Sequence, residues 1–157
     1  MGTHAHEPAA GRELTRTAVR ATLHCLAGCA IGEVLGLVIA TALGLGNAAS
    51  IALAVVLAFA FGYSFTVVPL LTAGLPPRGA VRISLASDTV SIGVMELVDN
   101  AFVLAVPGAM AAGLADGLFW GSLAAALAIA FVVALPVNRY LIARGRGHAV
   151  AHSHMGH

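Results

Sequence analysis

An apolar stretch near the amino end carries sulfur and acid at helical spacing. Cys25, Cys29 and Glu33 recur every four residues, and His24 stands beside the first cysteine. Side chains four residues apart lie on one face of a helix, with Cβ atoms about 5–6 Å apart. Two thiols at this distance can converge on one soft metal ion, which an imidazole or a carboxylate can also bind. The pattern favours metal or redox chemistry; the alternative for the cysteines is packing as small apolar side chains.

A second apolar stretch contains three acids, Asp88, Glu96 and Asp99, with no basic residue among them. A carboxyl group deep in a membrane costs several kcal/mol unless it is paired, protonated or hydrated. We expect Glu96 and Asp99 to belong to a metal site. Asp88 stands near the start of its segment, where a hydrated helix end explains it equally well. The full predicted metal set is His24, Cys25, Cys29, Glu33, Met95, Glu96 and Asp99, and a secondary polar track contains Asp88, Ser91 and Asn100.

Composition indicates that helices in lipid position these side chains. The 157 residues are 59% apolar and 10% charged, whereas a soluble domain is about 25% charged. A helix needs about 20 apolar residues to cross the hydrocarbon core. Four segments qualify, at about 21–45, 48–71, 83–106 and 118–138, and Gly/Pro-rich breaks separate them. The sequence therefore predicts an all-α bundle of four transmembrane helices over residues 21–143, after a polar segment 1–20 that contains histidine.

The basic residues predict the orientation of this bundle. All eight are arginine, and they fall before the first span, between the second and third, and after the fourth: Arg12, Arg16, Arg20, Arg78, Arg82, Arg139, Arg144 and Arg146. Because basic residues stay on the cytoplasmic side, both termini are predicted to be cytoplasmic. We expect a multi-pass protein of a bacterial inner membrane. The net charge of +1 gives no indication of a nucleic-acid partner.

Depth in the membrane links the two chemical stretches. Glu33 and Glu96 each lie about twelve or thirteen residues into a span that starts on the cytoplasmic side, so both are expected near the membrane midplane. If the first and third spans touch, the acids and thiols form one polar track.

Glycines form a separate stripe on the first span. Gly28, Gly32 and Gly36 are spaced like the small residues that let two membrane helices approach closely. We expect helix packing there, with a second copy of the chain as the partner.

The carboxyl end is rich in histidine. Residues 144–157 contain His148, His152, His154 and His157, and His4 and His6 lie at the amino end. Histidine-rich tracts bind transition metals, so we expect this tail to capture metal. The alternative is a solvated tail or the remnant of a tag.

Three stretches resemble a known family. They are His24-Cys25-x-x-Gly28-Cys29-x-x-Gly32-Glu33, then Met95-Glu96-x-x-Asp99-Asn100, and Pro136-x-Asn138-Arg139 followed by Ala143-Arg-Gly-x-Gly147-His148-Ala. Over residues 18–154 the chain resembles a bacterial membrane family catalogued as domain-of-unknown-function family 4396. The resemblance implies that the His, Cys, Glu and Asp residues are the family's own pattern. Its members look similar to proteins found beside copper-handling genes, which implies copper as the metal.

Three functions follow from these patterns. The first is binding or transport of a transition metal, with copper favoured over zinc because thiols and Met95 suit Cu(I). Its partners would be the lipid bilayer, a second copy of the chain, and a metal chaperone or a larger membrane protein. The second is a membrane metalloenzyme or redox protein, which we favour less because no nucleophile–base pair is visible. The third is a structural or assembly subunit.

Overall fold

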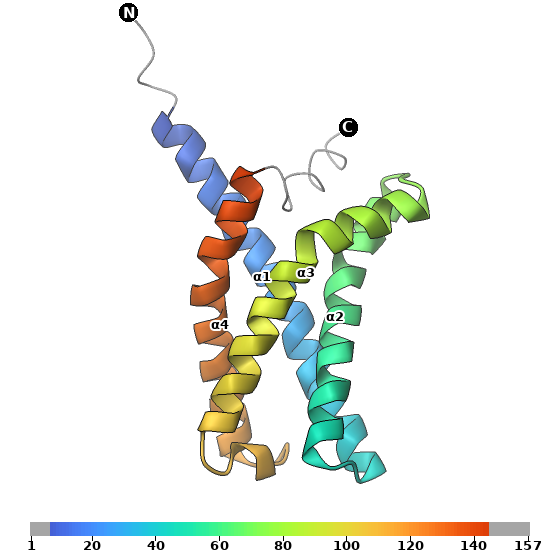
Figure 1. The fold of residues 1–157 in the computed structure, drawn as a ribbon, viewed down its shortest axis with the longest axis vertical. Helices are drawn as coiled ribbons and strands as arrows, with labels where there is room; N and C mark the ends of the chain where they lie inside the picture. The colour runs from blue at the N-terminus through green and yellow to red at the C-terminus, as the bar shows by residue number, and fades with distance from the viewer. Residues whose placement is uncertain (1–6, 145–157) are drawn as a thin grey trace, which may run out of the picture.

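The computed structural model of the protein describes residues 7–144, and this part of the chain is entirely helical (Figure 1). Its elements are α1 (Glu7–Leu43), α2 (Asn47–Thr72), α3 (Pro77–Ala105), the short 3-10 helix η1 (Ala109–Ala111) and α4 (Gly117–Ala143). The prediction of an all-α fold with four long helices is confirmed. η1 was not predicted.

The helices end where glycine and proline interrupt the apolar runs. Gly44 and Gly74 adopt left-handed backbone conformations, with φ of 64° and 89°. After each glycine, a backbone N–H turns back onto the helix: Leu45 donates to Ala40 at 2.9 Å and Leu75 to Leu70 at 3.1 Å. This is the glycine-dependent end that satisfies the last helical carbonyls. α3 then begins at Pro77, a position that suits proline because the first turn needs no N–H donor.

α1 begins earlier than the sequence predicts. The expected span starts at residue 21, whereas the helix starts at Glu7. At 1.5 Å per residue, its 37 residues extend about 55 Å, well beyond a hydrocarbon core of about 30 Å. The added turns contain alanine, glutamate, leucine and arginine, which are good helix formers. Part of the predicted polar segment is therefore an extension of the first helix, which projects from the bundle (Figure 1).

Three helices are long and apolar enough to cross a membrane: α1 from Gly11 to Leu43, α2 and α4. Their length and hydropathy define a multi-pass membrane protein. α3 is 29 residues long, but it carries two arginines in its first turns and three acids further on. Its composition alone therefore does not mark it as a span.

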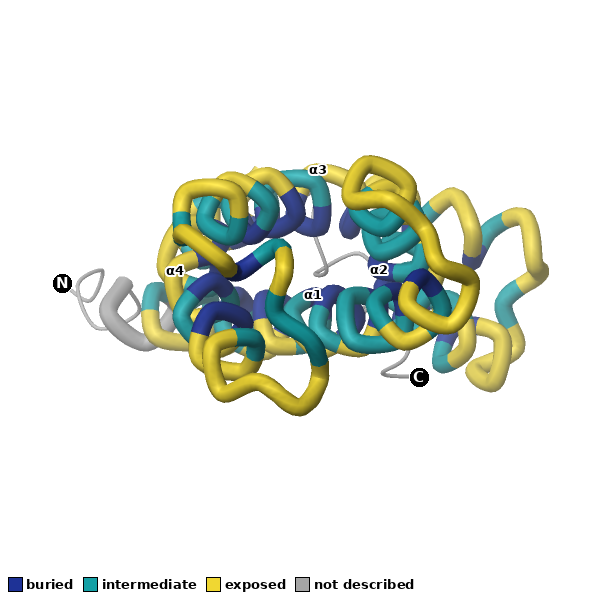
Figure 2. The backbone as a smooth tube through the Cα atoms, turned by 90° about the horizontal axis from the view of Figure 1, so that it is seen from below, coloured by how far each residue is buried: buried dark blue, intermediate teal, exposed yellow. Residues whose placement is uncertain are grey.

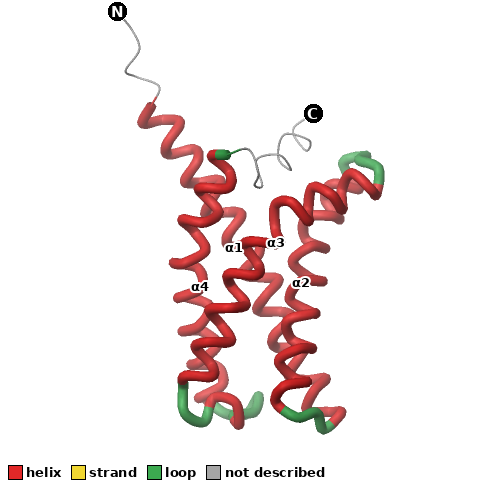
Figure 3. Tube along the Cα trace, in the orientation of Figure 1, coloured by secondary structure: helices red, strands yellow, loops and turns green. Residues whose placement is uncertain are grey.

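The four long helices run alternately up and down. Each packs against the next along the chain, α4 also packs against α1, and α1 contacts α3 across the bundle. Figure 1 shows α1 and α3 crossing, with α2 and α4 on either side, and Figure 3 shows the connections at the two ends. Viewed along the bundle, the buried residues face the space between the helices (Figure 2).

The two ends of the bundle differ in charge. At one end α1 and α3 begin and α2 and α4 end. The exposed arginines of the described chain lie in the half of the bundle nearer this end: Arg12, Arg16, Arg20, Arg78, Arg82, Arg139 and Arg144. We call this the arginine end. The opposite end contains the α1–α2 turn and the α3–α4 connection, where Asp116 is the charged residue.

The glycine stripe of α1 packs against α2 of the same chain. A Cβ atom on Gly28 would lie 2.7 Å from the Cα atom of Gly62, and one on Gly36 would lie 2.7 Å from that of Ala54. A Cβ atom on Gly32 would overlap the backbone of Ala58. The expectation that this groove receives a second copy of the chain is therefore wrong, because α2 already fills it.

Candidate metal centre

Three carboxyl groups meet where α1 crosses α3. Glu33 comes from α1, and Glu96 and Asp99 come from α3. One oxygen from each lies within 4.8 Å of the other two. Glu33 is half-buried, whereas Glu96 and Asp99 are 5% and 1% exposed. The sequence places Glu33 and Glu96 at one depth, and contact between the two helices brings them together. We call Glu33, Glu96 and Asp99 the acidic triad.

The buried oxygens of the triad have few hydrogen-bond donors. Within the described chain, both carboxylate oxygens of Asp99 and Oε1 of Glu96 are buried without a well-formed hydrogen bond, and the side chain that interacts with Asp99 is the carboxyl group of Glu33. Asn100 donates from Nδ2 to the backbone oxygen of Glu96 at 2.8 Å and only weakly to its Oε2, at 3.5 Å. Like charges this close repel strongly in a low-dielectric interior. The triad is therefore an arrangement that must hold protons or a cation.

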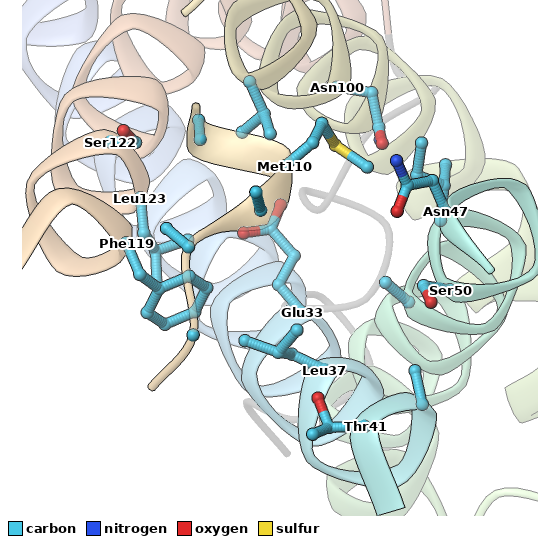
Figure 4. Close-up of a pocket in the computed structure, with 18 of the residues that line it drawn as sticks. Glu33, Leu37, Thr41, Asn47, Ser50, Asn100, Met110, Phe119, Ser122 and Leu123 are labelled. Atoms are coloured by element: carbon cyan, nitrogen blue, oxygen red, sulfur yellow. The ribbon is translucent and has the colours of Figure 1, made fainter. Parts of the chain in front are cut away.

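A pocket of about 510 Å³ reaches the triad from the end opposite the arginines. Glu33 and Asp99 line its floor, and Glu96 lies behind them outside the lining. Figure 4 shows Glu33 pointing into the middle of the pocket, with Phe119 and Leu123 on one side and Asn47 and Ser50 on the other. Residues 109–113, which include η1, provide another wall. The pocket gives the triad a route to the opposite end of the bundle.

A sulfur-rich layer adjoins the triad on the side of the arginine end. Cys25, Cys29 and Met95 belong to one buried cluster, and both thiols are free. Cys29 lies one helical turn before Glu33, and its thiol interacts electrostatically with the Glu96 carboxyl. The remaining members of the cluster are apolar: Ala58, Ile92, Ala130 and Ala134. We call this cluster the sulfur layer.

His24, also in the predicted metal set, is half-buried on α1 and faces α2. Its ring contacts that of Phe65 edge to face, with 5.4 Å between the ring centroids. The cluster of side chains that could hold an ion is the acidic triad, and it contains neither His24 nor the two cysteines. The structure thus divides the predicted metal set into the acidic triad, the sulfur layer and His24.

The secondary polar track divides in the same way. Asn100 lies beside the triad and lines the pocket, whereas Asp88 and Ser91 lie at the other end of the sulfur layer, where both interact with Cys25. Asp88 is fully buried and accepts hydrogen bonds from Ser84 at 2.9 Å and Ser87 at 2.8 Å. These two serines recur with Ser91 at intervals of three and four residues on the buried face of α3, a signal that sequence reasoning did not use.

Sequence reasoning also missed Asn138 as part of this buried network. In the sequence, Asn138 stands out only as part of the family-like stretch Pro136-x-Asn138-Arg139. The side chain is 2% exposed, and its Nδ2 donates to Thr22 of α1 and Ser91 of α3, each at 2.9 Å. An amide in an apolar interior finds partners on neighbouring helices because water does not reach it.

The predicted capture site in the tail, with His148, His152, His154 and His157, lies outside the described residues, as do His4 and His6.

The fold and site together define a class: a helical, multi-pass membrane protein with a buried acidic triad at the floor of a pocket. Residues 15–147 match a family described as "Domain of unknown function (DUF4396)", and the chain belongs to that family. The resemblance seen in the sequence is thereby confirmed. No curated protein and no solved structure matches the chain.

Proposed function

We propose that this protein binds a divalent transition-metal ion inside the membrane at the acidic triad. The observation that carries the proposal is Asp99, which is 1% exposed and has two buried oxygens without a well-formed hydrogen bond in the described chain. Metal–carboxylate bonds are about 2.0–2.2 Å long, so three oxygens around one ion lie about 3.3–3.8 Å apart. Oxygens within 4.8 Å of one another need only small side-chain movements to close on an ion.

The donor atoms bear on the choice of ion. Carboxylate oxygens accept Zn²⁺ and other divalent ions, whereas thiolates and thioethers select Cu(I). The triad therefore accepts Zn²⁺ or Cu²⁺ but suits harder divalent ions such as Mn²⁺ as well, and Cys25, Cys29 and Met95 would favour Cu(I) in the adjoining layer. We propose copper or zinc as the cargo, with the triad as the binding site reached from the pocket.

The charge distribution supports an orientation. We propose that α3 crosses the bilayer as the fourth span, since the acids on its buried face are shielded by the other helices. The arginine end then faces the cytoplasm of a bacterial inner membrane. In this orientation the pocket admits the ion from the opposite face. Buried polar side chains continue along α3 beyond the sulfur layer, which supports movement of the ion towards the cytoplasm.

Metal analysis of the full chain purified in detergent tests the binding site. Glu33→Gln and Asp99→Asn each remove one charged ligand with little change in shape, and we expect Zn²⁺ affinity to fall on the order of tenfold or more in each. Isothermal titration calorimetry measures the affinity, and elemental analysis measures the bound ion. Asp116→Asn is the matched control, because Asp116 is exposed and lies outside the triad.

The same titration with Cu²⁺ and Cu(I), in wild type and in Cys25→Ser/Cys29→Ser, separates the sulfur layer from the triad. If Asp99→Asn binds every ion as tightly as wild type, the proposal is wrong about the site.

A further inference from the structure

The pocket above the triad is larger than a metal ion requires. Its volume is about 510 Å³, whereas six waters around a divalent ion occupy roughly 180 Å³ at about 30 Å³ each. Cavities of about 300–1,000 Å³ with mainly apolar walls are typical of sites for small organic molecules. The apolar walls here include Leu37, Ile51, Val103, Met110, Phe119 and Leu123.

Charge restricts which molecules fit. The charged side chains that line the pocket are Glu33 and Asp99, both acidic and both at the floor. Asn47, Ser50 and Asn100 add neutral hydrogen-bonding groups to the walls. An anion or a metal–anion complex would meet negative charge without a basic partner in this lining. A cation with an apolar body would match both the floor and the walls.

We propose that this pocket binds a small organic amine, with its ammonium group on Glu33 and Asp99 and its hydrocarbon body between Leu37, Phe119 and Leu123. The ammonium group supplies the donors that the oxygens of Asp99 lack. The apolar body removes exposed hydrocarbon surface from water. This site shares two carboxyl groups with the proposed metal centre, but it does not depend on metal binding. Amine and metal ion should therefore compete.

Binding of benzylammonium to the detergent-purified full chain tests the proposal. Two probes separate charge from shape: benzyl alcohol has the same body without the charge, and methylammonium has the charge without the body. We expect benzylammonium to bind at least tenfold more tightly than either one, as measured by calorimetry or ligand-observed NMR. Zn²⁺ should displace it, and Glu33→Gln should weaken it at least tenfold.

Two tryptophan substitutions make a matched pair. Met110→Trp would fill the pocket from η1, whereas Leu97→Trp adds the same ring to a surface position that is 73% exposed. We expect at least a tenfold loss of benzylammonium binding in Met110→Trp and unchanged binding in Leu97→Trp. Should Met110→Trp not fold, Phe119→Ala removes an apolar wall and should weaken the amine about fivefold.

The outcomes separate this inference from the proposed function. Zn²⁺ binding without benzylammonium binding overturns the amine site and leaves the metal site standing. If Glu33→Gln binds both Zn²⁺ and benzylammonium as tightly as wild type, the metal site and the amine site are both overturned. If benzylammonium still binds to Met110→Trp, or if Zn²⁺ does not displace it, the amine binds elsewhere. Either result overturns the inference.

Discussion

At the scale of single residues, Asn138 shows how a polar side chain holds a membrane bundle together. It lies on α4, and one amide nitrogen donates to hydroxyls on two other helices, Thr22 on α1 and Ser91 on α3. Thr22 itself donates to the Ala18 carbonyl at 2.7 Å, so its hydroxyl proton is committed within α1. The amide is therefore the donor that links the helices.

Replacing this amide should destabilise the bundle measurably. Hydrogen bonds between membrane helices contribute about 0.6 kcal/mol on average and about 1.7 kcal/mol at most. We expect Asn138→Leu to lower the free energy of unfolding by about 1–2 kcal/mol, as measured by SDS titration in mixed micelles. A double-mutant cycle with Ser91→Ala isolates one bond, and the two effects should be less than additive. Full additivity would show that the Asn138–Ser91 bond does not contribute.

At the scale of helices, α1 and α2 meet along a seam formed by Gly28, Gly32 and Gly36 of α1 and the backbone of α2. The close contact depends on glycine, which has no side chain. Gly32 leaves space that the backbone of Ala58 occupies. Gly93 on α3 is the matched control, since a Cβ atom there meets no other atom within 4 Å.

We expect Gly32→Val to cost about 1–3 kcal/mol, the range for overpacking of a well-packed interior. Gly93→Val should cost less than about 0.5 kcal/mol, as for a substitution away from packed sites. The same SDS titration compares the two, and equal losses in both variants would contradict the role assigned to the seam.

The helices were predictable from the sequence, but their partners were only partly so. Gly44, Gly74 and Pro77 interrupt long apolar runs, so the ends of α1 and α2 and the start of α3 follow from local chemistry. The partner of the glycine stripe does not. Ala54, Ala58 and Gly62 repeat at the same spacing, but α2 is so rich in alanine that the repeat does not stand out. Local pattern identified a close-packing face without identifying what packs on it.

The candidate site was predictable to a similar extent. Residue type selected Glu33, Glu96 and Asp99, because ionisable groups are rare in lipid, but as part of a larger set that also held His24, Cys25, Cys29 and Met95. Depth paired only Glu33 with Glu96. The pocket was not predicted, since residues 109–113 have no helical or strand periodicity that would place them over Glu33. The end of the bundle from which the triad is reached depends on how that connection folds back, which only the assembled structure shows.

At the scale of the whole molecule, the exposed arginines of the described chain lie in the half of the bundle nearer the arginine end. The positive-inside rule then predicts which residues are accessible from each side. Ala73 lies in the α2–α3 turn at the arginine end, and Ala115 lies in the α3–α4 connection; both are exposed.

In intact cells, we expect a membrane-impermeant maleimide to label Ala115→Cys but to label Ala73→Cys only after permeabilisation. The native thiols provide an internal control, because Cys25 and Cys29 are fully buried. The opposite labelling pattern would reverse the orientation and place the pocket on the cytoplasmic side. Equal labelling of both positions would contradict a single topology.

The seam between α1 and α2 also bears on the order of biogenesis. These two helices are joined by a short turn, are strongly apolar and fit each other through complementary small residues. We therefore expect them to insert as a hairpin, since the close contact between them needs no residue from the rest of the chain. α3 has the opposite character, because its acids would be costly in lipid by themselves. We therefore expect α3 to enter the membrane by packing against the α1–α2 hairpin, which carries Glu33. This hairpin is present before α4 is synthesised.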